Sequence, residues 1–174
     1  MKKTAIFYGP AGGRTEEVAE RISQLIGEDN CDLVSLDKAT ISDLDRYENI
    51  IFGIATIGKE TWDAEPVESG WFDFMPELEK ADLHGKKIAI FGLGDHLRWP
   101  NHFVDAMGQL YKLLMEKEMD TIGKVSPDDY TFKESEALID GLFVGLPIDE
   151  DFEHELTDQR IKSWVDQITR QFHD

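Results

Sequence analysis

The chain contains a single cysteine, Cys31, among its 174 residues. One cysteine cannot form an intramolecular disulfide, which is typical of proteins in a reducing compartment. The sequence also lacks an apolar run of the ~20 residues that a membrane-spanning helix needs. Met1–Lys3 leads directly into a strand-like segment, without the apolar stretch of a signal peptide. We therefore expect a cytoplasmic protein that does not bind a membrane.

Positive charge is scarce, because 18 Lys and Arg residues stand against 36 Asp and Glu residues, for a net charge of −18. Such a chain repels polyanions, so we do not expect it to bind nucleic acid. The acidic residues are spread along the whole sequence and do not form a tail. Two interpretations remain open: solubility, as in salt-adapted proteins, or steering toward a basic partner.

Signatures of catalysis and metal binding are missing as well. The chain has five histidines: His84, His96, His102, His154 and His173. Neither they nor Cys31 have the spacing of zinc ligands, so no metal is expected. Of the histidines, His96 lies within the segment Leu93–Asn101, which follows the fourth predicted strand, and His102 comes directly after it. There is no Gly-x-Ser-x-Gly nucleophile elbow, and no Gly-Lys-Ser/Thr follows the first glycine-rich turn. We therefore predict no catalytic residue.

Strand-like and helical segments alternate along the chain. The predicted strands are Thr4–Tyr8, Asp32–Ser35, Asn49–Ile54, Lys87–Gly92 and one within Gly141–Leu146. The first, third and fourth are nearly continuous apolar runs, which is typical of parallel strands buried on both faces. Apolar stripes at helical spacing separate them, and Thr157 is predicted to cap the last helix. This pattern predicts a doubly wound α/β fold, a five-stranded parallel sheet with helices on both faces, in a single domain, residues 1–174. Lys124–Asp140 is predicted to be an insertion that splits the last strand.

The turn after the first strand is rich in glycine and leads straight into a helical pattern. It reads Gly9-Pro10-Ala11-Gly12-Gly13-Arg14-Thr15, followed by Glu16-Glu17-Val18. Backbone N–H groups at such a helix start lie at the positive end of the helix dipole and bind phosphate. In doubly wound sheets the loops at the carboxyl ends of the strands form the ligand site. The segments Gly9–Thr15, Ala55–Gly70 and Leu93–Asn101 are therefore expected to meet there.

These loops resemble those of the flavodoxins, which bind FMN. The phosphate-loop pattern of that family is roughly Gly-Ser/Thr-x-Thr-Gly-x-Thr-Glu. Gly9, Gly13, Thr15 and Glu16 match it, whereas Pro10 and Gly12 replace hydroxyl residues. Pro10 also has no backbone N–H. Arg14 either compensates with a charge-assisted bond to phosphate or points to solvent.

Two further loops carry the resemblance. Leu93-Gly94-Asp95-His96-Leu97-Arg98-Trp99-Pro100 is similar to the family's Gly-x-Gly-Asp-Gln-x-x-Tyr-Pro, and Trp99 stands at the tyrosine that stacks on the flavin. The family's Pro-Thr-x-x-x-Gly-Glu corresponds to the segment Ala55–Glu60. There the resemblance implies that the Gly58–Lys59 peptide flips on one-electron reduction, which glycine makes easy. Either Ile57 or Trp62 covers the inner face of the flavin.

The last third of the chain makes the resemblance more specific. Ser126-Pro127-Asp128-Asp129-Tyr130 is similar to the insertion of the long-chain flavodoxins, and Phe143-Val144-Gly145-Leu146-Pro147-Ile148-Asp149-Glu150-Asp151 is similar to the run that follows it. The chain is thus identified as a member of the long-chain flavodoxins with an atypical phosphate loop. The resemblance implies these cofactor-binding residues: Pro10, Ala11, Gly12, Gly13, Arg14, Thr15, Ala55, Thr56, Ile57, Gly58, Lys59, Leu93, Gly94, Asp95, Trp99, His102, Phe103 and Asp149.

The function implied by the resemblance is that of a low-potential, one-electron carrier with non-covalently bound FMN, and not that of an enzyme. The implied partners are basic redox proteins that bind transiently, namely a ferredoxin/flavodoxin–NADP reductase and low-potential oxidoreductases, and the chain is expected to be a monomer. Trp62, Asp63, Glu65 and Glu68 are predicted to belong to the docking face. Two alternatives remain open: an FMN-dependent NAD(P)H quinone or nitro reductase, and a flavodoxin-like binding module without FMN.

Overall fold

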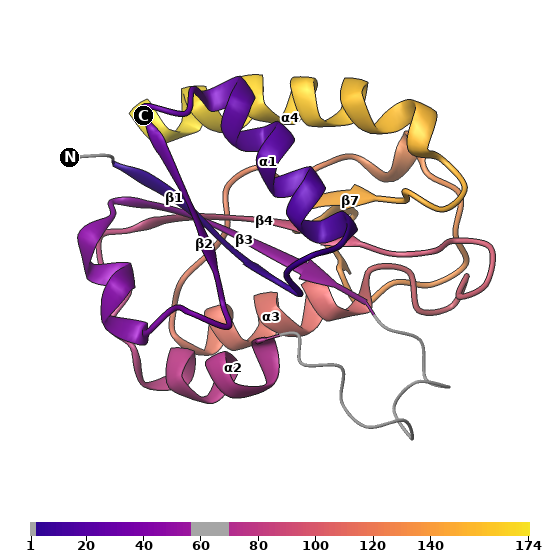
Figure 1. Ribbon diagram of the computed structural model, residues 1–174. Coiled ribbons are helices and arrows are strands. Elements are labelled where there is room, and N and C mark those ends of the chain that lie inside the picture. Colours follow the sequence, from indigo (N-terminus) through magenta and orange to yellow (C-terminus); the bar gives the residue numbers. More distant parts are fainter. Residues whose placement is uncertain (1–2, 57–69) are drawn as a thin grey trace.

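The structure, a computed structural model, describes residues 3–56 and 70–174. These residues fold into a five-stranded parallel sheet between two layers of helices (Figure 1). The predicted doubly wound α/β fold is confirmed. The elements of the sheet and its helices are β1 (Thr4–Gly9), α1 (Arg14–Ile26), β2 (Cys31–Ser35), η1 (Ile41–Arg46), β3 (Asn49–Ala55), α2 (Trp71–Lys80), β4 (Lys87–Leu93), α3 (Asp105–Glu116), β7 (Leu146–Ile148) and α4 (His154–His173). The strand order is β2-β1-β3-β4-β7.

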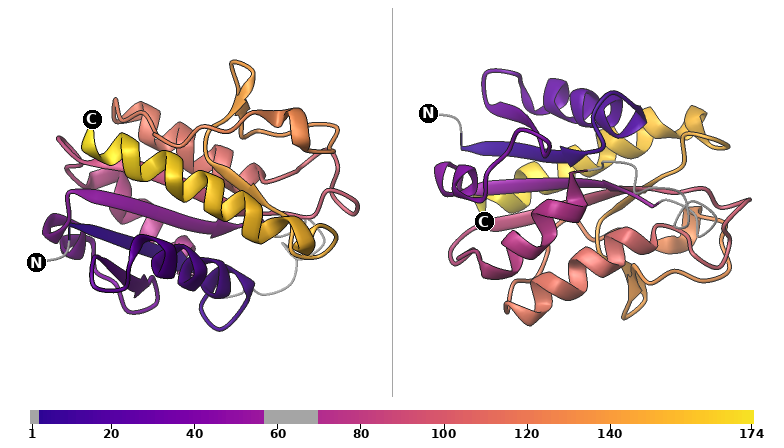
Figure 2. Two further views of the ribbon diagram at one scale, coloured as in Figure 1. Left: turned by 90° about the horizontal axis from the view of Figure 1, so that it is seen from above. Right: turned by 60° about the horizontal axis from the view of Figure 1, so that its bottom comes forward.

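The central strands are buried on both faces, as their unbroken apolar runs predict. In β1, the neighbouring residues Ile6 and Phe7 are both fully buried but pack into different cores, because successive side chains of a strand point to opposite faces. Helices α1 and α4 cover the face of Ile6, and α2 and α3 cover the face of Phe7 (Figures 1 and 2). None of the helices in the described residues is long and apolar enough to cross a membrane.

The fifth strand is built from two pieces that the insertion separates. Ile122 forms a parallel bridge with Ala89, and β7 pairs with Phe91–Leu93 farther along β4. The expected range of this strand, Gly141–Leu146, is wrong apart from its last residue. Gly141 has a φ of 81° and turns the chain between the short strands β5 (Leu138–Ile139) and β6 (Leu142–Phe143), so the apolar residues before Gly145 belong to a hairpin of the insertion.

The last helix begins one turn earlier than the sequence predicts. Glu153 occupies the N-cap position of α4, whereas the expected cap, Thr157, lies inside the helix and is 1% exposed. The chain turns before the helix because the Asp149 carbonyl oxygen accepts a hydrogen bond from Glu153 N (3.1 Å). A local turn therefore starts the helix, and no Ser or Thr cap is involved.

The strand ends that precede the candidate loops lie at one edge of the sheet. Gly9 at the end of β1 pairs with Ile54, Ala55 at the end of β3 pairs with Leu93, and Leu93 pairs with Ile148 at the end of β7. The loops that follow β1, β3, β4 and β7 therefore start side by side, as ligand sites in such sheets require.

Candidate functional site

The turn between β1 and α1 leaves open space beside a helix start. Gly12 has a φ of 78°, which favours glycine, and a Cβ atom at Gly12 or Gly13 would meet no heavy atom within 4 Å. Gly13 is the N-cap residue of α1, and no side chain caps the helix. The N–H groups of its first turn are therefore available to an anion.

Glu16 uses one of the donors of this turn. Its carboxylate accepts hydrogen bonds from Tyr8 Oη (2.6 Å) and from Gly12 N (2.7 Å). These two bonds, with the Tyr8 bond the stronger cause, lower the pKa of Glu16, while burial and the same carboxylate raise the pKa of Tyr8. Since Pro10 has no N–H, the donors left for an anion are the N–H groups of Ala11 and of 13–15 and the Thr15 hydroxyl.

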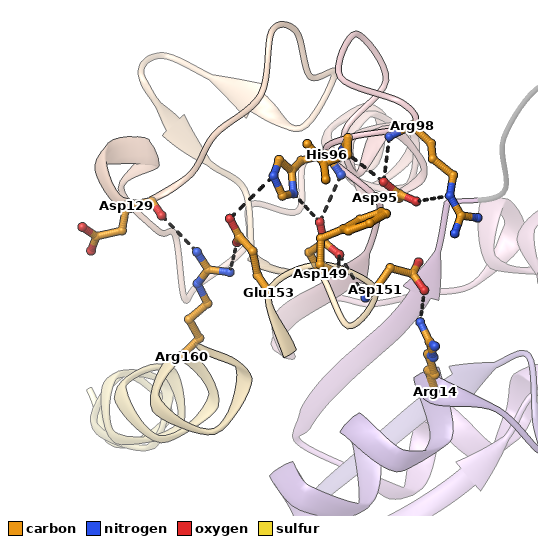
Figure 3. Close-up of polar contacts among 11 residues, drawn as sticks. Arg14, Asp95, His96, Arg98, Asp129, Asp149, Asp151, Glu153 and Arg160 are labelled. Atoms are coloured by element: carbon orange, nitrogen blue, oxygen red, sulfur yellow. Dashed lines mark hydrogen bonds and ion pairs between the residues drawn. The ribbon is translucent and has the colours of Figure 1, made fainter. Parts of the chain in front are cut away.

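Arg14 is held by a carboxylate of another loop. Its guanidinium forms an ion pair with Asp151, which follows β7 (Figure 3). Two turns later on α1, Arg21 pairs with Glu150 at 3.2 Å and with Asp158 at 3.5 Å. The Arg14 side chain thus bridges α1 to the loop between β7 and α4. Its two predicted roles, a bond to phosphate or exposure to solvent, stay predictions.

At the end of β3 the structure describes the chain up to Thr56. Thr56 N donates to the Leu93 carbonyl oxygen (2.8 Å), and its hydroxyl accepts a hydrogen bond from Ala106 N (3.0 Å) at the start of α3. Ala55 and Thr56 thus lie beside the loop that follows β4. The predicted site residues Ile57, Gly58 and Lys59, together with Trp62 and the acidic residues near it, lie outside the described residues.

The loop after β4 is folded around Asp95. Oδ1 of Asp95 accepts hydrogen bonds from the N–H groups of Leu97 (3.0 Å) and Arg98 (2.8 Å), and the Asp95 carbonyl oxygen accepts one from Trp99 N (3.1 Å). The other oxygen, Oδ2, is buried and accepts no hydrogen bond within the described residues, although Arg98 Nε lies 3.2 Å away (Figure 3). Gly94 N donates to the carbonyl oxygen of Ile148 in β7 (2.9 Å). The loop therefore presents a buried acceptor and the half-buried Trp99 at the sheet edge.

Two predicted residues of the next turn have different surroundings. The side chain of His102 is 41% exposed, with Nδ1 2.9 Å from Asp105 Oδ2, so it lies at the surface of the site. Phe103 is 1% exposed and packs against Phe132 and Phe143 of the insertion, with ring centroids 5.8 and 6.1 Å away. The side chain of Phe103 thus belongs to the core that anchors the insertion.

Asp149, directly after β7, is completely buried and hydrogen-bonded. Oδ1 accepts from the N–H groups of Asp151 and Phe152, each at 3.0 Å. Oδ2 lies 3.1 Å from His96 N, which donates to it, and 2.5 Å from His96 Nδ1. The predicted site residue therefore joins the loop after β4 to the loop after β7 (Figure 3).

Sequence reasoning missed a chain of side chains that extends from Asp149 to the insertion. His96 Nε2 lies 3.9 Å from Glu153 Oε1, and Glu153 Oε2 pairs with Arg160 at 2.5 Å. The guanidinium of Arg160 donates to the Asp129 carbonyl oxygen (Figure 3). It also stacks on the ring of Tyr130, 4.0 Å from the ring centroid. His96 was noted for its place in the loop, but nothing in its spacing from Glu153 and Arg160 predicts that the three meet.

The strand order and the loops at one edge define an α/β protein of the flavodoxin topology, with an anion-binding helix start. Comparison with known families agrees with this class: the family model described as Flavodoxin matches residues 6–164. The chain belongs to the flavodoxin family.

Individual relatives match over nearly the full length. The flavodoxin of Nostoc sp. is 40% identical over 171 residues, which cover 98% of each chain. Flavodoxin 1 of Azotobacter vinelandii is 36% identical over 176 residues, covering 99% of this chain and 98% of that protein. Among solved structures, a Fusobacterium nucleatum flavodoxin with bound flavin mononucleotide has a TM-score of 0.85 at 25% identity, and 99% of each chain is covered.

Proposed function

We propose that this chain is an electron carrier that binds FMN non-covalently at the carboxyl edge of the sheet and passes single electrons at low potential. The observation that carries the proposal is the glycine turn before α1, where open space lies beside an uncapped helix start. Flavodoxin relatives that match 98% of the chain support it. We propose further that residues 1–174 act as a single FMN-binding domain.

The described residues fit FMN. The N–H groups of the turn that Glu16 does not use suit a phosphate group, and Arg14 lies beside them with its charge paired to Asp151. The buried Oδ2 of Asp95 accepts no hydrogen bond within the described residues and faces only the Arg98 guanidinium at 3.2 Å. It suits a hydrogen-bond donor, of which FMN has several in its ribityl chain and ring. The half-buried ring of Trp99 suits stacking on an aromatic system. The other predicted residues of these loops, Leu93, Gly94 and His102, complete the proposed site.

Bound FMN supplies the redox chemistry of the protein. The protein's part is electrostatic: a net charge of −18 raises the energy of an added electron and so lowers the reduction potential. An electron-rich Trp99 ring beside the flavin acts in the same direction. The enzyme alternative, an NAD(P)H-dependent reductase, is not favoured, because the relatives are flavodoxins.

Gly13→Ala tests the anion site. The φ of Gly13 is −138°, which any residue adopts, and the new Cβ would meet no protein atom within 4 Å. We expect an unchanged free energy of unfolding but about tenfold weaker FMN binding, since the methyl group would take space at the phosphate. Binding is measured by the quenching of FMN fluorescence on titration with apoprotein. Unchanged affinity would place the phosphate elsewhere, and a wild-type protein that does not bind FMN would refute the function.

The partners that we propose are a ferredoxin/flavodoxin–NADP reductase and other low-potential oxidoreductases with basic surfaces, which bind transiently to a monomeric, cytoplasmic carrier. The acidic charge supports a basic partner, and the single cysteine supports a reducing compartment. We expect the rate of FMN reduction by such a reductase to fall severalfold as salt is raised from low to physiological concentration. Stopped-flow absorbance measures it, and a salt-independent rate would speak against electrostatic docking.

A further inference from the structure

His96 lies between two carboxylates that belong to different segments. Its ring nitrogen Nδ1 is 2.5 Å from Asp149 Oδ2, at the end of β7, and Nε2 is 3.9 Å from Oε1 of Glu153, the N-cap residue of α4. The side chain of His96 is 11% exposed, and the ring of Phe152 packs edge-on against it with a centroid distance of 6.2 Å. The imidazole thus connects the loop after β4 to the start of α4 (Figure 3).

The hydrogen bonds decide which nitrogen of His96 exchanges its proton. An ionised carboxylate only accepts hydrogen bonds, so Nδ1 carries a hydrogen in both states of the ring. The nitrogen that gains or loses a proton is therefore Nε2, which faces Glu153. With the proton, Nε2–H and the Glu153 carboxylate attract each other; without it, a lone pair faces the carboxylate.

Other charged groups surround the ring. Glu153 also pairs with Arg160, which lowers the negative charge that reaches His96 but does not remove it. Within its own loop, Asp95 and Arg98 form an ion pair at 3.2 Å. In the loop after β7, Asp151 pairs with Arg14. Among the described residues, Asp149 and Glu153 are the carboxylates that face the ring nitrogens of His96, at 2.5 and 3.9 Å.

We propose that His96 is a positioning residue of the cofactor site, and that its protonation at Nε2 tightens FMN binding by clamping the loop after β4 onto the start of α4. The inference rests on the proposed function, because that loop carries Asp95 and Trp99. The protonated ring connects two carboxylates and orders the loop before the cofactor arrives, which lowers the entropic cost of binding. It also adds positive charge near an anionic ligand.

The direction of the pH effect follows from linkage. Histidine changes its charge between about pH 5 and pH 8. If the protonated clamp favours FMN, affinity is higher on the acidic side of this range, and bound FMN in turn favours the protonated ring by the same factor. The affinity for FMN should therefore fall as the pH rises through this range.

The test compares FMN dissociation constants of wild type and His96→Gln across this pH range. Glutamine can still donate to Asp149 but does not titrate. We expect the variant to bind FMN about tenfold more weakly near pH 6 and about equally near pH 8.5. Because the FMN phosphate titrates in both measurements, its contribution cancels in the ratio of the two constants. His84→Gln, an exposed histidine before β4 and thus at the opposite edge of the sheet, is the matched control and should leave the profile unchanged.

A second variant separates the possible results. Glu153→Gln removes the charge that faces Nε2 of His96 and should flatten the pH dependence of the affinity. A ratio of dissociation constants that stays constant over the whole range would overturn the role of His96. Wild-type protein that is folded but does not bind FMN at any pH would instead refute the proposed function.

Discussion

Asp149→Ala is expected to lower the free energy of unfolding by about 4 kcal/mol, because it leaves four donors without their buried acceptor. The donors are the N–H groups of His96, Asp151 and Phe152, and the His96 ring. These donors are only partly buried, so each lost hydrogen bond costs about 1 kcal/mol. The variant should also lose most of its FMN affinity, since the two loops that Asp149 joins are no longer held together.

Urea unfolding of the apoprotein measures this loss without the contribution of bound FMN. Asp149→Asn is the matched control: it keeps one acceptor oxygen, so we expect about half of the effect. An alanine variant as stable as wild type would mean that water or other groups satisfy the donors, and that Asp149 does not organise the site.

Gly145→Ala is expected to destabilise the fold by about 3 kcal/mol, through overpacking between the insertion and β4. A Cβ atom at Gly145 would lie 2.1 Å from the carbonyl oxygen of Ile90 and 3.0 Å from Met107 Sδ. The first contact is with backbone in a central strand, which side-chain rotation cannot relieve. The end of the insertion would have to move away from β4, and with it the start of β7.

The free energy of unfolding from urea titration again provides the measurement. Gly141→Ala is the control within the insertion: its Cβ would meet nothing within 4 Å, so it bears only the cost of a positive φ, about 1 kcal/mol. If both variants lose the same stability, the close approach of Gly145 to Ile90 is not important for the fold.

The sequence predicted the sheet well because its signals are local. Unbroken apolar runs such as Ile50–Ile54 are typical of strands buried on both faces, and they stand at β1, β3 and β4 as expected. The glycine turn before α1 was predicted for the same reason. The positive φ of Gly12 and the open space beside Gly12 and Gly13 depend on a few adjacent glycine residues. The loops at the carboxyl edge follow from this topology.

Contacts between distant residues were not predicted. The pairing of Arg14 with Asp151 joins residues far apart in sequence, and no spacing rule indicates it. The apolar residues Leu142 and Phe143 suit a sheet strand and a hairpin of the insertion equally well, and the tertiary contacts of Phe143 with Phe103 and Tyr130 favour the hairpin. The start of α4 was misplaced because the backbone of Asp149, and no typical cap residue, forms the turn before it.

The most direct test of the central claim is a stepwise anaerobic reduction of the FMN-loaded protein with dithionite, followed by absorption spectroscopy. If the protein is a one-electron carrier, a long-wavelength band should grow until about one electron per FMN has been added and then decay, because the protein separates the two reduction steps. Direct bleaching of the oxidised spectrum, with no such band at any stage, would contradict a one-electron carrier and favour two-electron chemistry.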